Sequence, residues 1–167
     1  MNSSIRSTLE DIVSRGTERG FTVSGAESCT GGLCAKLLTD LPGSSAVFCG
    51  ACVTYTNEIK MKLLGVSPEL IEQHTEVSYA CAEAMAEGAR RAFGSTVAYS
   101  TTGFAGPSGG TERDPVGTVY IGISTSRETV SYRLSLPVVS TRDEIRNSAA
   151  AFVIDKLLSL ISEEDAV

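Results

Sequence analysis

The order of strand and helix patterns along the chain constrains its fold more than any other feature. Up to residue 94, strand-like and helix-like patterns alternate. Three strand patterns then follow one another, at 96–102, 116–124 and 129–136. The last two are separated by only a few residues, whereas a parallel return needs a dozen or more, so at least one pair must be antiparallel. We therefore predict a three-layer α/β/α fold with a mixed sheet that contains at least one antiparallel strand.

Capping signals mark where the helices begin and end. Gly20 stops the first helix, Ser78 begins a long alanine-rich helix, and Gly94 closes it. Thr141 and Glu144 have the spacing of a capping box and open the last helix. There is no internal repeat, low-complexity tract or linker, so we expect a single domain over residues 1–167. The other predicted elements are strands at 21–26 and 47–56, a helix that starts after 27–32 and ends before Pro42, a helix at 57–64, and one opened by Ser67-Pro68-Glu69.

Charge and composition exclude several classes of partner. The formal net charge of -6 disfavours nucleic acid and anionic membranes, which attract basic surfaces. No segment approaches the roughly 20 apolar residues of a membrane span, and the start of the chain is too acidic for a secretory signal. Five cysteines at irregular spacings do not form a disulfide framework, because their number is odd. We expect a cytoplasmic protein that binds neither nucleic acid nor membrane.

Ser28 is the first candidate for chemistry, because it stands where a strand gives way to a helix. The residues Thr30, Gly31 and Gly32 follow it. Unpaired N–H groups at a helix start favour an anion or a developing oxyanion, and glycines let a substrate approach the backbone. A serine or threonine in this position is also a common helix N-cap. Taken alone, the segment fits the capping role better than the catalytic one.

A nucleophilic serine needs a base, and the sequence offers two. His74 is the only histidine and ends a predicted helix, where a capping or surface role is usual. Lys60 follows a strand that contains Tyr55, and burial near a tyrosine can lower a lysine pKa enough for it to accept a hydroxyl proton. Taken alone, Lys60 fits a solvated position on an amphipathic helix better than a catalytic one.

A glycine-rich segment, Thr102 to Gly110, connects two predicted strands. Its glycines permit a concave row of N–H donors that could hold a phosphate, but a flexible loop is an equally good interpretation. The segment is neither a Walker A loop nor a dinucleotide fingerprint. Arg142 and Arg146, one turn apart, could bind an anion or be solvated.

The Cys49–Cys52 pair matches a redox motif only in spacing. It lies in a predicted strand rather than before a helix. Residues three apart on a strand are about 10 Å apart and point to opposite faces, too far for a disulfide. No second cysteine or histidine pair completes a zinc site. We predict no metal and no cofactor.

Together the motifs resemble the CinA C-terminal domain family over nearly the whole chain. The Glu-Ser-Cys-Thr-Gly-Gly segment is the most specific of them. The resemblance implies a stand-alone amidohydrolase of NAD salvage that converts nicotinamide mononucleotide to nicotinate mononucleotide and ammonia, acting as a cytoplasmic homo-oligomer on a pyridine nucleotide. The motifs are Ala26–Gly32, Pro42–Ala46, Val53–Glu58, Lys60, Thr102–Pro107, Gly109-Gly110 and Pro115–Val119.

The resemblance also implies the roles of individual residues. Ser28 is the expected nucleophile, with Lys60 and Tyr55 in the positions that activate it. The expected substrate-binding residues are Thr30, Gly31, Gly32, Asn57, Thr102, Gly103, Gly106, Gly109, Gly110 and Arg142.

This chain departs from the family pattern near the expected phosphate side. The family usually has Gly-Ala where Thr75 and Glu76 stand, Asp in place of Ser108, and Lys in place of Asp114. These changes exchange a cation for an anion, while the nucleophile side is intact. Two alternatives therefore stay open: a non-catalytic ligand-binding or interaction module of the competence and DNA-damage response, and a Ser-Lys amidase for another small amide.

Overall fold

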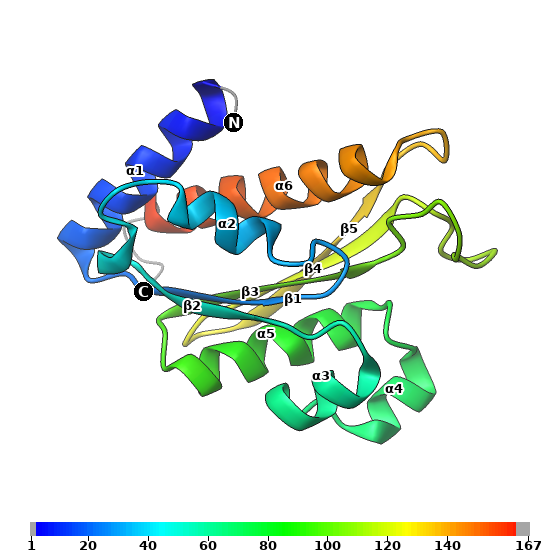
Figure 1. Ribbon diagram of the computed structural model, residues 1–167. Coiled ribbons are helices and arrows are strands. Elements are labelled where there is room, and N and C mark those ends of the chain that lie inside the picture. The colour runs from blue at the N-terminus through cyan, green and yellow to red at the C-terminus, as the bar shows by residue number, and fades with distance from the viewer. Residues whose placement is uncertain (1–2, 163–167) are drawn as a thin grey trace.

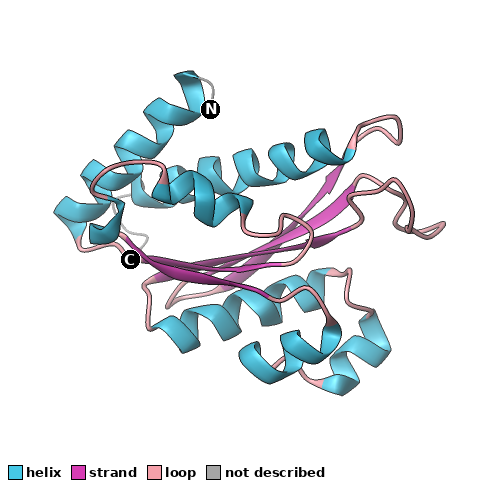
Figure 2. Ribbon diagram, in the orientation of Figure 1, coloured by secondary structure: helices cyan, strands magenta, loops and turns pink. Residues whose placement is uncertain are grey.

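The computed structural model describes residues 3–162, which form a mixed five-stranded sheet between two layers of helices (Figures 1 and 2). The strand order is β2-β1-β3-β4-β5. β1 pairs in parallel with β2 and β3, whereas β4 pairs antiparallel with β3 and β5. The predicted three-layer α/β/α fold and its antiparallel pairing are confirmed. The strands are β1 (Val23–Glu27), β2 (Phe48–Val53), β3 (Val97–Gly103), β4 (Thr118–Ser124) and β5 (Thr129–Ser135).

The helices divide between the two faces of the sheet, as Figure 1 shows. One face carries α1 (Ser3–Arg19), α2 (Leu33–Thr39) and α6 (Arg142–Ser162). The other carries α3 (Asn57–Leu64), α4 (Pro68–His74) and α5 (Tyr79–Phe93), and a short 3-10 helix, η1 (Ser44–Ala46), precedes β2. None of the helices within residues 3–162 combines the length and apolarity that crossing a membrane requires.

Burial follows the position of each strand in the sheet. β1, β3 and β4 lie inside the sheet and are almost wholly buried, whereas the edge strands β2 and β5 are partly exposed. Helices cover both faces, so an apolar cluster forms against each face of the sheet. The larger one joins the sheet to α1, α2 and α6 through Leu9, Ile12, Val23, Leu38, Ile121, Ile145, Val153 and Leu157. The smaller one joins it to α3 and α5 through Ala26, Leu64, Val66, Cys81, Met85, Ala89 and Ala98.

Several predicted strand boundaries differ from the structure by one to three residues, and the start of β4 shows a physical reason. The pattern at 116–124 predicts a strand from Val116, but β4 begins at Thr118. Gly117 has φ 97°, and the Thr118 N–H donates to the Pro115 carbonyl at 3.0 Å, so the residues before Thr118 form a turn. The left-handed conformation of Gly117 interrupts the apolar run, so the extended backbone begins only after it.

Three strand ends meet at one edge of the sheet, and this register positions the site. Glu27, the last residue of β1, pairs with Val53 of β2 on one side and Thr101 of β3 on the other. The residues that follow these strands therefore converge, as ligand-binding residues do at the carboxyl ends of parallel strands. The loop between β3 and β4 and the start of α6 lie at the same end of the molecule (Figure 1).

Candidate active site

Ser28 and Lys60 meet although they are far apart in the chain. Lys60 Nζ donates to Ser28 Oγ at 3.1 Å and to the Thr54 carbonyl at 2.9 Å. Ser28 directly follows β1, Thr54 follows β2, and Lys60 lies on α3. The Lys60 side chain is 1% exposed and Ser28 8% exposed. A buried lysine held against a serine hydroxyl is the arrangement in which a lysine can act as a base.

Burial also sets the charge state of Lys60. Desolvation lowers the pKa of its ammonium, because the charged form loses hydration in the interior. The negative charge of Glu76 opposes this effect and raises the pKa of Lys60. Burial raises the pKa of the Cys29 thiol to about 12 and that of the Cys81 thiol to about 11, so both neighbouring thiols are protonated near neutral pH. Cys29 is therefore a neutral thiol beside Ser28 rather than a competing nucleophile.

The turn that presents Ser28 is built around a buried carboxylate, Glu27. Its side chain is fully buried and accepts hydrogen bonds from five donors. A carboxylate at this position satisfies the orphan donors of the α2 start and complements its dipole. The donors are the N–H groups of Gly32 (2.8 Å), Cys34 (3.2 Å) and Ala35 (2.8 Å), and the hydroxyls of Thr30 (2.7 Å) and Tyr99 (3.0 Å).

A glycine in β1 makes room for one of these contacts. A Cβ built on Gly25 would lie 2.2 Å from the Tyr99 ring, so only glycine lets this side chain pass over β1 to reach Glu27. The other side of the turn is held by Arg146, whose Nη2 donates to the Thr30 carbonyl at 2.8 Å. Arg146 thus positions the turn that carries Ser28.

The three residues after Cys29 have structural contacts here. Thr30 is fully buried, and its hydroxyl is shared between Glu27 and Thr101. The Gly31 N–H donates to the Ser28 carbonyl and the Gly32 N–H to Glu27. None of the three lines the pocket described below. Their role in substrate binding stays a prediction.

Ser28 opens onto a solvent-accessible pocket, which we call the Ser28 pocket. It joins the three strand ends to the start of α6. Three predicted substrate residues, Thr102, Gly103 and Arg142, are among its walls. The full set is Ser28, Cys29, Tyr55, Lys60, Glu76, Val77, Thr102, Gly103, Phe104, Ala105 and Arg142.

Arg142 lies at the mouth of the pocket with its charge uncompensated. Its Nη1 donates to the Gly106 carbonyl at 2.7 Å and its Nη2 to the Tyr55 hydroxyl at 3.1 Å. Both acceptors are neutral, and among the described residues no carboxylate forms an ion pair with it. The structure thus brings Tyr55 to Arg142, and a role for its hydroxyl in activating Ser28 stays a prediction.

The glycine-rich loop contributes only its first part to the pocket. Gly103, Phe104 and Ala105 line it, whereas Gly109 and Gly110 do not. Asn57, at the start of α3, is not part of the wall either. The predicted role of these three outer residues in binding stays a prediction.

Asp114 differs from the sequence interpretation, which placed its charge near the substrate. Its carboxylate is buried and accepts from the Tyr120 hydroxyl at 2.8 Å and from Arg133 Nη2 at 3.2 Å. It is absent from the pocket wall, and its charge is paired with that of Arg133 in β5. The sequence could not show this, because both partners lie in later strands.

Replacing this carboxylate should therefore cost stability rather than change substrate affinity. Asp114→Asn leaves Arg133 without its anion, which we expect to cost about 2–3 kcal/mol, or roughly 5–10 °C in Tm. KM should not change. Glu112→Gln, at an exposed neighbour, is the control, and thermal unfolding with steady-state kinetics is the measurement. An altered KM at unchanged Tm would place Asp114 at the substrate instead.

Two residues of the site were not predicted from the sequence. Glu27 precedes the nucleophile, but nothing in its neighbours shows that it is buried and capping α2. Glu76 was noted only as a departure from the family, and the structure places it in the pocket wall near Lys60. His74 ends α4 on the surface, away from Ser28.

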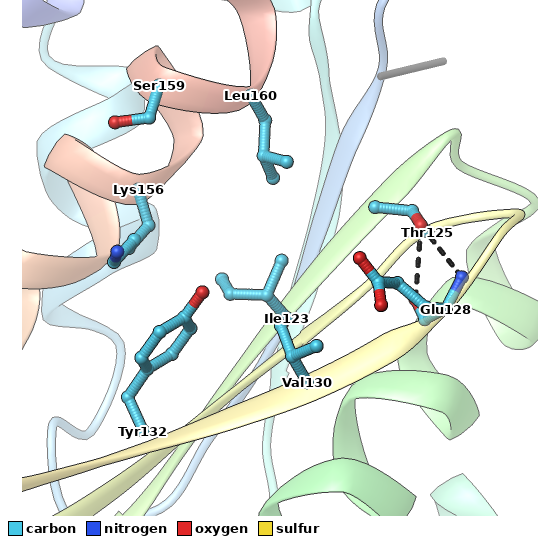
Figure 3. Close-up of a pocket in the computed structure, with 8 residues that line it drawn as sticks. All are labelled: Ile123, Thr125, Glu128, Val130, Tyr132, Lys156, Ser159 and Leu160. Carbon is cyan, nitrogen blue, oxygen red and sulfur yellow. Dashed lines mark hydrogen bonds between the residues drawn. The ribbon is translucent and has the colours of Figure 1, made fainter. Parts of the chain in front are cut away.

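A second cavity lies on the other helical layer, between β5 and the end of α6 (Figure 3). Ile123, Val130 and Leu160 give it apolar walls, and Lys156 Nζ lies 4.4 Å from the centre of the Tyr132 ring. Thr125 there is bonded to Glu128 across the β4–β5 turn. Its wall also contains Ser159 and Lys156, but the Ser159 hydroxyl donates to the Asp155 carbonyl at 3.0 Å, so Ser28 and Lys60 form the candidate active site. Within residues 3–162, no three potential metal ligands cluster.

Comparison with known proteins decides the family. The model of the CinA C-terminal domain matches residues 5–161. The chain belongs to the CinA C-terminal domain family. A solved family structure, the competence/damage inducible protein CihA from Agrobacterium tumefaciens, is 35% identical with a TM-score of 0.91, covering 95% of this chain and 96% of that one. The predicted resemblance is thereby confirmed.

Relatives within the family have names of different precision. A CinA-like protein of Shewanella denitrificans is 47% identical over 96% of this chain. A protein of Shewanella oneidensis named nicotinamide-nucleotide amidohydrolase PncC is 45% identical over 92% of this chain. The matched regions are 38% and 36% of those two proteins, so this chain spans less than two fifths of their length.

Proposed function

We propose that the chain hydrolyses the carboxamide of nicotinamide mononucleotide, giving nicotinate mononucleotide and ammonia. One observation carries the proposal: the buried Lys60 Nζ lies 3.1 Å from Ser28 Oγ at the floor of an open pocket. The name of the Shewanella oneidensis relative supports the choice of substrate. A desolvated lysine in contact with a serine hydroxyl favours an enzyme over a non-catalytic module.

The reaction begins with a proton transfer between these two side chains. Neutral Lys60 takes the Ser28 proton as Oγ attacks the carboxamide carbon, and the resulting ammonium gives that proton to the departing nitrogen. Ammonia leaves, and an acyl ester remains on Ser28. Water then attacks the ester with Lys60 again as the base, releasing the carboxylate and restoring the serine.

The turn after Ser28 provides the oxyanion site in this proposal. Within residues 3–162, the backbone N–H groups of Cys29 and Thr30 donate to no backbone acceptor. They lie in the turn between β1 and α2, and backbone donors fixed in this way stabilise a developing oxyanion. Glu27 and Arg146 hold this turn from opposite sides, so its donors are fixed before the substrate arrives.

Arg142 is the proposed partner of the substrate phosphate. It is the cation at the pocket mouth, and its two hydrogen bonds to neutral acceptors orient the guanidinium without neutralising it. The phosphate end of the nucleotide would lie there, with the ring and its carboxamide toward Ser28.

Ammonia release tests the proposal directly. The purified chain is given nicotinamide mononucleotide, nicotinamide riboside, nicotinamide and a set of unrelated small amides. We expect the nucleotide to have the highest kcat/KM. Hydrolysis of another amide in preference would keep the Ser28 and Lys60 chemistry but change the substrate, and no hydrolysis of any of them would refute the proposal.

Arg142→Ala separates phosphate recognition from catalysis. The variant should raise KM for the nucleotide about ten- to a hundredfold, because a charge-assisted contact is worth roughly 1.5–3 kcal/mol. KM for the riboside, which has no phosphate, should change little. Arg127→Ala, at an exposed residue after β4, is the control. Equal effects on both substrates would mean that the phosphate binds elsewhere.

A further inference from the structure

A carboxylate without a partner stands in the wall of the Ser28 pocket. Glu76 lies between α4 and α5 and is partly buried. Among the described residues, its side chain accepts no hydrogen bond and forms no ion pair. The chemistry of amide hydrolysis does not require it, since Ser28 and Lys60 provide nucleophile and base. An unpaired charge beside a base needs another explanation.

The backbone around Glu76 is held in place. Thr75 has φ 68° and ψ 166°, a region that β-branched residues almost never occupy, and such strain persists only where surrounding contacts hold it. The Thr102 hydroxyl donates to the Glu76 carbonyl at 2.7 Å, and the Ser78 hydroxyl to the Thr75 carbonyl at 3.0 Å. Position 76 is thus tied to the end of β3 and to α5, the two elements that flank the pocket.

The charges of Glu76 and Arg142 act on different residues of the site. Glu76 raises the pKa of Cys81 and of Lys60, whereas Arg142 lowers the pKa of Cys29. The pocket therefore holds a free anion and a free cation at different places. A ligand with a positive and a negative group, spaced apart, would complement both.

We propose that Glu76 selects substrates whose aromatic ring is cationic. The inference rests on the proposed function, in which Arg142 binds the phosphate and the ring lies near Ser28. The pyridine nitrogen of nicotinamide mononucleotide bears the ribose and so has a fixed positive charge. A carboxylate in the wall stabilises that charge, and it gives no such advantage to a neutral ring of the same shape.

The decisive measurement is binding, made in a Ser28→Ala background so that no turnover occurs. The probes are nicotinamide mononucleotide and its 1,4-dihydro form, which have the same phosphate but a cationic and a neutral ring. Adding Glu76→Gln should weaken binding of the cationic form about tenfold and leave the neutral form unchanged. Glu72→Gln, at an exposed residue of α4, should affect neither. Equal losses for both forms, or no loss for either, would overturn the proposal.

A second readout separates ring selection from an effect on the base. Glu76→Gln removes a charge that raises the pKa of Lys60, so the acidic limb of kcat/KM should move to lower pH for every substrate. If that shift is the only effect, Glu76 acts through Lys60 alone and the selection proposal is wrong. If neither nucleotide binds at all, the proposed function fails. Ring selection is then judged on 1-methylnicotinamide against nicotinamide, and equal binding of these two refutes it.

Discussion

Ser28→Ala should abolish amide hydrolysis while leaving the fold and substrate binding nearly unchanged. Removing a catalytic nucleophile costs on the order of a millionfold in kcat, because no other group can form the acyl intermediate. The hydroxyl makes one contact with Lys60, so its loss should cost only about 1 kcal/mol of stability. Single-turnover kinetics and thermal unfolding measure the two effects.

The neighbouring thiol is the matched control for this variant. Cys29→Ser should retain activity, because the Cys29 thiol is neutral, with a pKa raised to about 12 by burial. Substantial activity in Ser28→Ala would reduce Ser28 to a structural residue and require direct attack by water. An inactive Cys29→Ser enzyme, correctly folded, would instead point to the thiol as nucleophile.

Lys60→Met should reduce kcat at least about a thousandfold, since general-base catalysis commonly contributes factors of this size. In the wild type, kcat/KM should rise with pH and level off above the pKa of Lys60, because only the neutral amine accepts the serine proton. Burial puts that pKa below the ordinary value of 10.5. A pH–rate profile without this limb, or one unchanged in Lys60→Met, would exclude Lys60 as the base.

Lys60 should also make the stability of the wild type depend on pH differently from that of the Lys60→Met variant. Between the lowered folded-state pKa and 10.5, the unfolded chain binds a proton that the folded chain does not, so wild-type stability rises with pH. Lys60→Met has no such dependence at this position. Its gain in unfolding free energy over the wild type should be largest at lower pH and shrink as pH approaches 10.5. Denaturant titrations at several pH values would show this convergence.

The fold was predictable because strand order depends on the sequence pattern and on connector length. Two successive strands joined by a short connection require antiparallel pairing whatever their side chains do. The meeting of Ser28 and Lys60 followed from a similar rule, since both come after strands whose carboxyl ends meet at one edge. Such features depend on the backbone, and a single sequence is sufficient to indicate them.

The charged residues were harder to place, because the environment of each depends on side chains distant in the sequence. Asp114 forms an ion pair with Arg133 of β5 and accepts a hydrogen bond from Tyr120 of β4. Tyr55 was expected beside Lys60, yet its hydroxyl contacts Arg142 from the last helix. The residue type alone could not show whether each side chain contacts these partners or solvent.

The orientation of α6 determines where the chain can be attached to something else. Its first residue, Arg142, is at the pocket mouth, and its last, Ser162, is twenty residues further along a continuous helix. At 1.5 Å per residue this separates the two ends by about 30 Å. A fluorophore or surface linker attached at position 162 is therefore anchored well away from the pocket, so protein immobilised through this position should keep the access route for its substrate.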